Sequence, residues 1–509
     1  MDEQASAEAA EAPRKRARGP RTLDRRTVLG AAILGGAGMA TGRLLAGTRT
    51  PERIRVPVTG TLANAEGLDW VSPLGDDSAK VAHLLRRTTF GYTQAELEQA
   101  QSDGYARTVE RLVESPPAEP KPLANADKAS QLPGQQLRLE ELRAWWLDWM
   151  LASPTPFAER MTLFWHGHFT SDFRKVGLQS PFVYWQNQTW RRFALGDLRT
   201  MLYEVTVDPA MLRYLDLAQS TARNPNENYA RELMELYTMG AGTFGEDDVK
   251  SASKALSGWR EPRTESMIEA AKQEAMQRGR TIPPQLASAK PDAVRTGVFA
   301  RERSHTGGLP FLGVTRQWDT QAVIDRILEM DVTAPFVARK VAVQFVSPSP
   351  DEEYVAALAA GFRRTKYSVK ELMRTVLLSP EFTSQAAYRS LIKSPIELML
   401  STAKALGNSA LARLATQFGE QMGQTLFDPP SVGGWPNNES WISSNAMLAR
   451  ANFVTTAVTQ TRRLPPAERV HATQLDSVLS PQTLRLLNEA RDERARWIVA
   501  LAGPEFQLK

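Results

Sequence analysis

The sequence predicts an all-α protein: one large multi-helix globular domain with at most a minor β-hairpin near residues 298–313. Apolar residues recur at helical spacing from residue 79 to 501, and no sustained alternation of apolar and polar residues, the mark of strands, accompanies them. The 509 residues are 42% hydrophobic and 23% charged, as in ordinary globular chains. A chain of this length buries a large core without covalent crosslinks.

The first 46 residues are expected to be a disordered basic tail followed by a signal peptide. Residues 1–21 are rich in Ala, Glu and Arg and have no apolar periodicity. Arg25 and Arg26 then precede an apolar, glycine-rich stretch that ends near Thr41 and is too short for a confident membrane span. This arrangement resembles a twin-arginine signal. We expect a periplasmic, extracellular or envelope-associated protein, which contacts a membrane only through this segment if the signal is uncleaved.

After a linker rich in Pro, Gly and Thr over 47–78, a helical domain is expected over 79–507. Thr93 and Glu96 have the spacing of a capping box at the start of the second helix. A loop is expected over 116–133 and a polar insertion over 262–295, and residues 298–299 and 311–312 are expected to pair around Gly307-Gly308. The remaining helices are expected at 136–151, 156–165, 182–193, 197–206, 208–215, 227–239, 246–258, 319–330, 333–346, 351–363, 368–378, 394–406, 409–418, 444–460 and 481–501.

Composition excludes several classes of function. The absence of cysteine rules out disulfides, thiolate metal sites, iron–sulfur clusters and covalently attached haem. The net charge of +5 arises mostly in residues 1–50, which hold nine Lys and Arg against five Asp and Glu. The body of the chain is therefore nearly neutral, and nucleic acid is not an expected partner.

Two of the five histidines, His166 and His168, flank Gly167 and are candidate metal ligands. If Gly167 ends the preceding helix, the segment is extended and both imidazoles point to one face. Imidazole and carboxylate ligands suit Zn, Mn or non-haem Fe. The alternative is a pair of histidines packed among aromatic residues, with their ring nitrogens bonded to the backbone.

The segment 226–240 predicts an amphipathic helix that ends at Gly240. Glu232 and Glu235 project from its polar side and are candidate acid/base residues, and Glu232 or Glu227 is a candidate metal ligand. The alternative is a solvated helix face with an intrahelical Glu227–Arg231 pair.

Two loops complete the candidate features. His305 lies in 299–313 beside a double glycine, where the backbone can approach a ligand closely, and is a further candidate metal ligand. Trp435 and Trp441 flank the turn that follows Gly433-Gly434. These tryptophans predict either a cleft for a carbohydrate or aromatic ligand, or a hydrophobic clamp.

The motifs, in their order, make the chain similar to a bacterial family catalogued as domain of unknown function 1800. The residues that carry the resemblance are 86–91, 164–169, 226–240, 248–249 with 258–259, 393–398, 432–435 and 504–506. The resemblance spans about 79–507 and implies an exported protein whose gene neighbours often encode a sulfatase-like partner. The family has no assigned activity. Where it tends to have His-Asp followed by Gly and Lys, this chain has His305-Thr306-Gly307-Gly308-Leu309.

Two functional hypotheses follow. In the first, the protein is a binding or assembly partner of a co-exported sulfatase-like protein or of a cell-envelope polymer, with 299–313 and 431–441 as contact surfaces. In the second, His166, His168, His305 and Glu232 or Glu227 bind a divalent metal, and the protein is a metal-dependent hydrolase or oxidase.

The twin-arginine signal is tested by replacing Arg25 and Arg26 together with lysine. Lysine keeps the charge but not the guanidinium pair that marks the signal, so the precursor is expected to accumulate in the cytoplasm. Cell fractionation and immunoblotting measure this outcome. Undiminished export of the double variant would refute the assignment.

Overall fold

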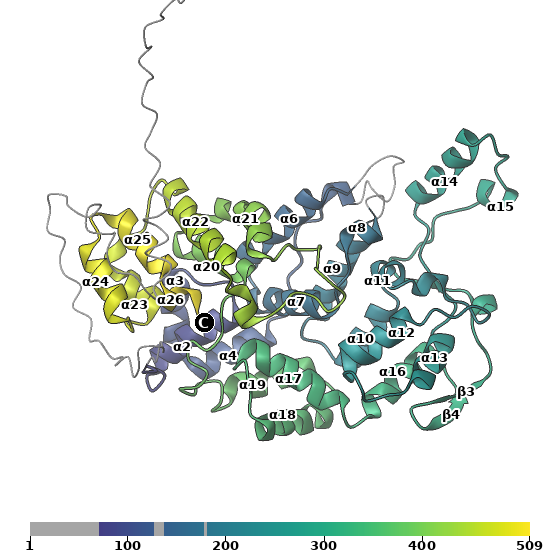
Figure 1. Ribbon diagram of the computed structural model, residues 1–509, viewed down its shortest axis with the longest axis horizontal. Coiled ribbons are helices and arrows are strands. Elements are labelled where there is room, and N and C mark those ends of the chain that lie inside the picture. The colour runs from purple at the N-terminus through teal and green to yellow at the C-terminus, as the bar shows by residue number, and fades with distance from the viewer. Residues whose placement is uncertain (1–70, 127–136, 178–180) are drawn as a thin grey trace, which may run out of the picture.

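The computed structural model describes residues 71–126, 137–177 and 181–509 of a mainly helical chain, as predicted (Figure 1). The expected tail, the signal peptide and most of the linker lie outside these residues. Two small antiparallel sheets of two strands each accompany the helices. Among the described residues, no helix combines the length and the apolar character needed to cross a membrane.

The helices expected in the first half are present with small shifts of their ends, and further helices accompany them. Together they are α2 (Asp77–Thr88), α3 (Gln94–Asp103), α4 (Tyr105–Glu114), α6 (Leu139–Ala152), α7 (Pro156–His168), α8 (Phe173–Val176), α9 (Phe182–Arg192), α10 (Leu198–Thr206), α11 (Pro209–Tyr214), α12 (Asn228–Glu232), η2 (Leu233–Thr238) and α13 (Glu246–Ala255). Of these, α4 and α8 are additional, and the single helix expected at 227–239 is α12 followed by the π-helix η2. The capping box expected at Thr93 is present, because Glu96 N donates to the Thr93 hydroxyl and Thr93 N donates to Glu96.

The second half of the chain contains the remaining helices. They are α14 (Glu265–Gln277), α15 (Pro284–Ala287), α16 (Thr320–Glu329), α17 (Thr333–Phe345), α18 (Glu352–Arg364), α19 (Val369–Leu378), α20 (Pro395–Ala405), α21 (Leu414–Met422), α22 (Ser444–Gln460), α23 (Val470–Leu475), α24 (Pro481–Glu489), α25 (Glu493–Ala502) and α26 (Pro504–Gln507). The single helix expected at 481–501 is thus two helices, because Asp492 caps a new start. The polar segment 262–295 contains α14 and α15, which stand apart from the body in Figure 1.

The strand pairing expected around Gly307-Gly308 is wrong. β2 (Val298–Phe299) pairs with β1 (Trp259–Arg260), and the hairpin is formed by β3 (Gly308–Phe311) and β4 (Val314–Gln317). Its two-residue turn is Leu312-Gly313, with φ of 46° and 81°. A turn with two left-handed residues matches the twist of a hairpin, which favours this pairing over a longer loop.

One continuous apolar core runs through the molecule from Leu84 in α2 to Phe506 in α26. The two ends of the described chain lie in the same part of it, because Arg86 of α2 bonds Asp476 at the end of α23 and α23 packs on α26. The final residues pair with the segment before α20: Lys393 N donates to the Gln507 carbonyl (2.9 Å) and Lys509 N to the Leu391 carbonyl (2.8 Å).

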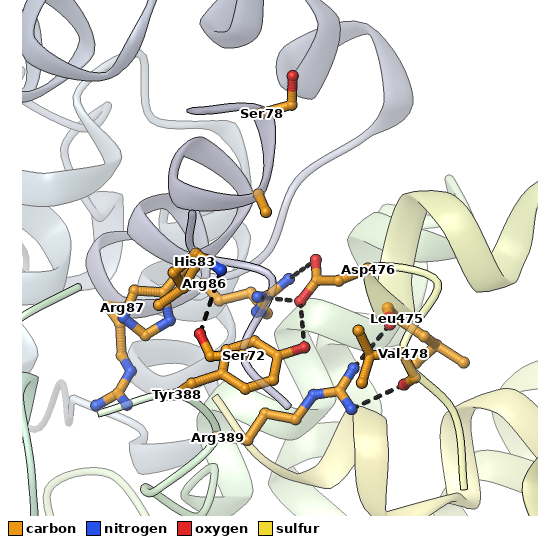
Figure 2. Close-up of polar contacts among 12 residues, drawn as sticks. Ser72, Ser78, His83, Arg86, Arg87, Tyr388, Arg389, Leu475, Asp476 and Val478 are labelled. Atoms are coloured by element: carbon orange, nitrogen blue, oxygen red, sulfur yellow. Dashed lines mark hydrogen bonds and ion pairs between the residues drawn. The ribbon is translucent and has the colours of Figure 1, made fainter. Parts of the chain in front are cut away.

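A buried ion pair ties α2 to the C-terminal helices (Figure 2). Arg86 donates to both carboxylate oxygens of Asp476 at 2.7 and 2.5 Å, and the Tyr388 hydroxyl donates to the same carboxylate at 3.0 Å. Next to this pair, Arg389 donates to the carbonyls of Val478 and Leu475. The bidentate geometry fixes the angle between α2 and the end of α23.

A second buried cluster is centred on Glu397 in the first turn of α20. Its carboxylate forms ion pairs with Arg160 of α7 and with Lys509, and both partners are buried. Glu397 also completes a capping box with Ser394. Burial opposes its ionisation, but the charges of Arg160 and Lys509 hold the pKa of Glu397 at about 2.

Replacing Glu397 with glutamine is expected to lower the free energy of unfolding at pH 7 by about 3–5 kcal/mol, because two buried cations lose their counter-charge. Glutamine still serves in the capping box, so the change isolates the charge. Denaturant titration measures the loss.

The pH dependence of this loss has a definite sign. The folded pKa of Glu397 lies below the usual value of 4.5, so its contribution is complete above pH 4.5 and disappears as the pH falls towards 2. The difference in the free energy of unfolding between the wild type and the Glu397→Gln variant should therefore become smaller as the pH falls from 4.5 to 2. The Glu246→Gln variant is the control: it loses only a solvent-exposed ion pair with Arg231, so its stability should stay close to that of the wild type. A constant difference down to pH 2 would contradict the assignment.

Candidate functional site

A cavity of about 340 Å³ opens between α7, α17 and the loop 433–441. We call it the Trp435 pocket. It unites two of the features singled out in the sequence, the segment 164–169 and the double-tryptophan loop. Its lining residues are Arg160, Leu163, Phe164, Gly167, His168, Phe336, Arg339, Lys340, Val343, Gln344, Ser394, Gln424, Gly433, Trp435, Pro436, Asn437 and Trp441.

Two helices supply most of the lining through stripes of identical spacing. In α7 the lining positions are 160, 163, 164, 167 and 168, and in α17 they are 336, 339, 340, 343 and 344. Residues three and four apart share one side of a helix, so each stripe is a single face. The core of the protein takes another face of α17, which carries buried Val337, Val341 and Phe345. On α17 the pocket therefore takes a face other than the one that carries the core residues, whereas on α7 Leu163 belongs to the core and also lines the pocket.

Close backbone contact holds the third wall in place. Gly434 has φ of 83°, and a Cβ built there would lie 2.3 Å from the Gly167 carbonyl oxygen. Only glycine fits this position. The Thr170 hydroxyl donates to the Val432 carbonyl at 2.6 Å. These contacts hold the turn at 432–435 against the end of α7. Trp435 and the buried Trp441 both line the pocket as a result.

A hydrogen-bonded pair lies on the opposite side of the pocket. Lys340 Nζ donates to His168 Nδ1 (3.2 Å) and to the Leu236 carbonyl (2.9 Å), and His168 Nε2 donates to the Tyr237 carbonyl (3.0 Å). Both carbonyls belong to η2, a π-helix whose last carbonyls lack partners within the helix. The negative end of η2 thus orients a lysine and a histidine at the pocket.

The environment keeps His168 neutral and weakens the charge on Lys340. Burial, and then the nearby Lys340 charge, lowers the pKa of His168 well below its usual value. Burial lowers the pKa of Lys340 to about 8. Lys340 is therefore still mostly protonated at pH 7, although its ammonium is partly desolvated.

His166 faces the interior instead. Its ring lies 5.0 Å from the rings of Trp146, Phe427 and Trp435. Its Nε2 accepts from Phe427 N at 3.1 Å, and no described group bonds its Nδ1. Burial lowers the pKa of His166 to about 3. This arrangement is the packed, backbone-bonded histidine that the sequence left open as an alternative.

The expectation of an extended segment at 166–168 is wrong. α7 continues to His168, and Phe169 N still donates to the Trp165 carbonyl at 2.7 Å. Positions two apart on a helix differ by about 200°, so the two imidazoles point to different sides. Gly167 does not end α7, because buried residues on several sides of the helix continue to pack through its last turn.

The three glutamates lie on the partly exposed side of α12 and η2. Glu227 pairs with Arg231 at 3.4 Å, as in the structural alternative, and Arg231 also bonds Glu246. Burial raises the pKa of Glu232, and the neighbouring charge of Glu235 adds to the effect. Neither Glu232 nor Glu235 lines the Trp435 pocket.

His305 lies in the loop between η3 (Arg301–Arg303) and β3. Its backbone N–H donates to the Ser257 hydroxyl at 3.1 Å, and its Nε2 is buried over Gly307 without a hydrogen-bond partner among the described residues. Within the described ranges, no three His, Cys, Asp or Glu side chains form a group that could hold a metal ion. The metal site stays a prediction.

Sequence reasoning missed Lys340, a basic residue in the wall of the pocket. A signal was present, because the segment 333–345 carries two stripes: an apolar one and a second one of Phe336, Arg339, Lys340, Val343 and Gln344. A basic stripe on a helix is most often solvated, so spacing alone does not distinguish it from a pocket wall.

The fold and the pocket define a class: a large helical protein with a concave site lined by aromatic and basic side chains. The chain belongs to the family described as "Protein of unknown function (DUF1800)", whose model matches residues 83–508. No curated protein and no solved structure matches the chain.

The metal hypothesis is tested with the double variant His166→Ala/His168→Ala. It predicts that protein purified after export carries Zn, Mn or Fe and that the double variant loses the metal, because two of its ligands are gone. Elemental analysis measures the content, and His471→Ala serves as the control. A folded double variant with the metal content of the wild type would end the hypothesis.

Proposed function

We propose that this protein is an exported, non-catalytic binding protein and that its Trp435 pocket holds one sugar residue of a cell-envelope polymer. One observation carries the proposal: two tryptophans and a small set of polar groups converge on a single cavity. A concave, mostly apolar site with a few oriented polar groups is the usual form of a small-ligand site.

The chemistry of the lining favours a sugar over a purely apolar ligand. Aromatic faces are electron-rich and attract the polarised C–H groups on the flat face of a sugar ring. Gln344, Ser394 and Asn437 line the same space and supply amide and hydroxyl groups for sugar hydroxyls. The volume of about 340 Å³ is near the lower end for ligand pockets and fits one ring of a longer polymer.

Export by the twin-arginine route belongs to the same proposal, because the polymer lies outside the cytoplasm. A co-exported sulfatase-like protein is the proposed partner. The region 298–317 favours a protein contact, since Phe299 and Val314 are exposed apolar side chains and β4 is exposed along its length. An exposed strand edge offers unpaired backbone groups to a partner.

The alternative function is a metal-dependent hydrolase or oxidase that uses His166, His168 and His305 with Glu232, Glu235 or Glu227. Two buried imidazole nitrogens without a described hydrogen-bond partner, His166 Nδ1 and His305 Nε2, favour it. Against it, both ring nitrogens of His168 are already bonded, and a metal would have to displace Lys340 or the Tyr237 carbonyl.

Replacing Trp435 with alanine tests the proposed function. The variant is expected to bind envelope-polysaccharide fragments at least about tenfold more weakly, because a stacking face at the centre of the site is lost. Isothermal titration calorimetry with purified oligosaccharides measures the affinity.

Trp435→Phe is the matched control, since it keeps an aromatic face and should retain most of the binding. Circular dichroism of both variants verifies the fold. Equal affinities of the wild type and the alanine variant, or no binding by the wild type, would reject the proposal.

A further inference from the structure

We propose that the sugar bound in the Trp435 pocket carries an acidic group, a carboxylate or a sulfate, and that Lys340 is the residue that binds it. The inference rests on the proposed function and adds the chemical class of the ligand.

The charges around the pocket are unbalanced. Three cationic residues line it, Arg160, Arg339 and Lys340, whereas no Asp or Glu is among its described lining residues. Two of the cations have acidic partners outside the lining: Arg160 pairs with Glu397, and Arg339 pairs with Glu352. The described contacts of the Lys340 ammonium are all to uncharged groups. Lys340 is thus the cation that an incoming anion would neutralise.

The geometry of Lys340 prepares it for this contact. A lysine ammonium has three N–H donors, and His168 Nδ1 and the Leu236 carbonyl accept two of them. The third remains for a ligand. The ammonium also lies 4.9 Å from the centre of the Phe336 ring, which lines the same wall. A side chain already held by two hydrogen bonds loses little conformational entropy on binding.

The partial burial of Lys340 strengthens its interaction with an acidic group of the ligand. A charge in an enclosed, partly apolar site interacts more strongly with an opposite charge than it would in water. Burial lowers the pKa of Lys340, and the negative charge of a bound acid would favour its protonated form again.

The ligand class follows from combining this cation with the two tryptophans. A nucleic acid gains its affinity from many phosphate contacts, whereas this pocket offers one cation without an acidic partner. A sugar ring that carries one acidic group can stack on Trp435 and at the same time pair its charge with Lys340. Uronic acids and sulfated sugars have this chemistry.

The test compares ligands with and without the acidic group on the same sugar backbone. The probes are a galacturonic acid trisaccharide and its methyl ester, and a sulfated galactan oligosaccharide and its desulfated form. The wild type is expected to bind the acidic member of at least one pair about tenfold or more tightly, with an affinity that falls as salt is added. The pair that shows the preference identifies the acid as carboxylate or sulfate.

Lys340→Gln is expected to remove this preference while it keeps the affinity for the neutral member, because an amide still donates hydrogen bonds but carries no charge. The matched control is Lys370→Gln, in which an exposed lysine paired with Glu114 loses the same charge. The control should keep the full preference.

The outcomes separate this inference from the function on which it rests. If the wild type binds acidic and neutral sugars equally well, the role of the acidic group is overturned, while the proposal of a sugar site is unaffected. This outcome is measured on the wild type and does not depend on whether Lys340→Gln folds. If a folded Lys340→Gln variant keeps the full preference for the acidic sugar, the role of Lys340 is also overturned. Failure of every sugar to bind rejects both proposals. If the protein binds a single-stranded oligonucleotide more tightly than any of the sugars, the ligand is a nucleic acid and the proposed acidic sugar is rejected.

Discussion

The buried carboxylate of Glu397 is the interaction on which the arrangement of the molecule depends most. It joins three segments that are far apart in the sequence: α7 through Arg160, the start of α20, and the last residue, Lys509. Breaking a buried pair leaves an uncompensated charge, which costs far more than a surface pair. Because Arg160 and Ser394 also line the Trp435 pocket, the same cluster that anchors the fold sets the floor of the candidate site.

The pocket exists because helix faces are positioned by contacts outside it. The core fixes the rotation of α17, and the contact of Gly434 with Gly167 fixes the distance of the tryptophan loop from α7. The π-helix η2 then directs two carbonyls towards Lys340 and His168. These constraints come from side-chain packing in the core and from backbone contacts, so the polar groups at the pocket are oriented before a ligand arrives. This preorganisation is what a binding site requires.

The segments that mark the family divide into two groups. Arg86 and Glu505 serve the architecture: Arg86 pairs with Asp476 (Figure 2), and Glu505 accepts from Ser480 N and the Thr483 hydroxyl at the start of α24. The segments 164–169 and 432–435, together with the end of 226–240, meet at the pocket. The motifs on which the resemblance was based therefore include residues that hold the architecture and residues that line the pocket, and only the contacts tell them apart.

The sequence by itself determined the helical class, the order of the helices, the capping box at Thr93 and the family, because these depend on spacing and local chemistry along the chain. It left open whether Trp435 and Trp441 line a cleft or form a hydrophobic clamp. Only the tertiary structure decided that His166 and His168 point to different sides of one helix, that the hairpin turns at Leu312-Gly313, and that Lys340 faces the tryptophans across a cavity. The directions of the histidines and of Lys340 depend on contacts between segments far apart in the sequence, such as Lys340 with His168 and Phe427 with His166. The hairpin turn depends instead on the left-handed backbone of Leu312 and Gly313, which spacing along the chain did not reveal.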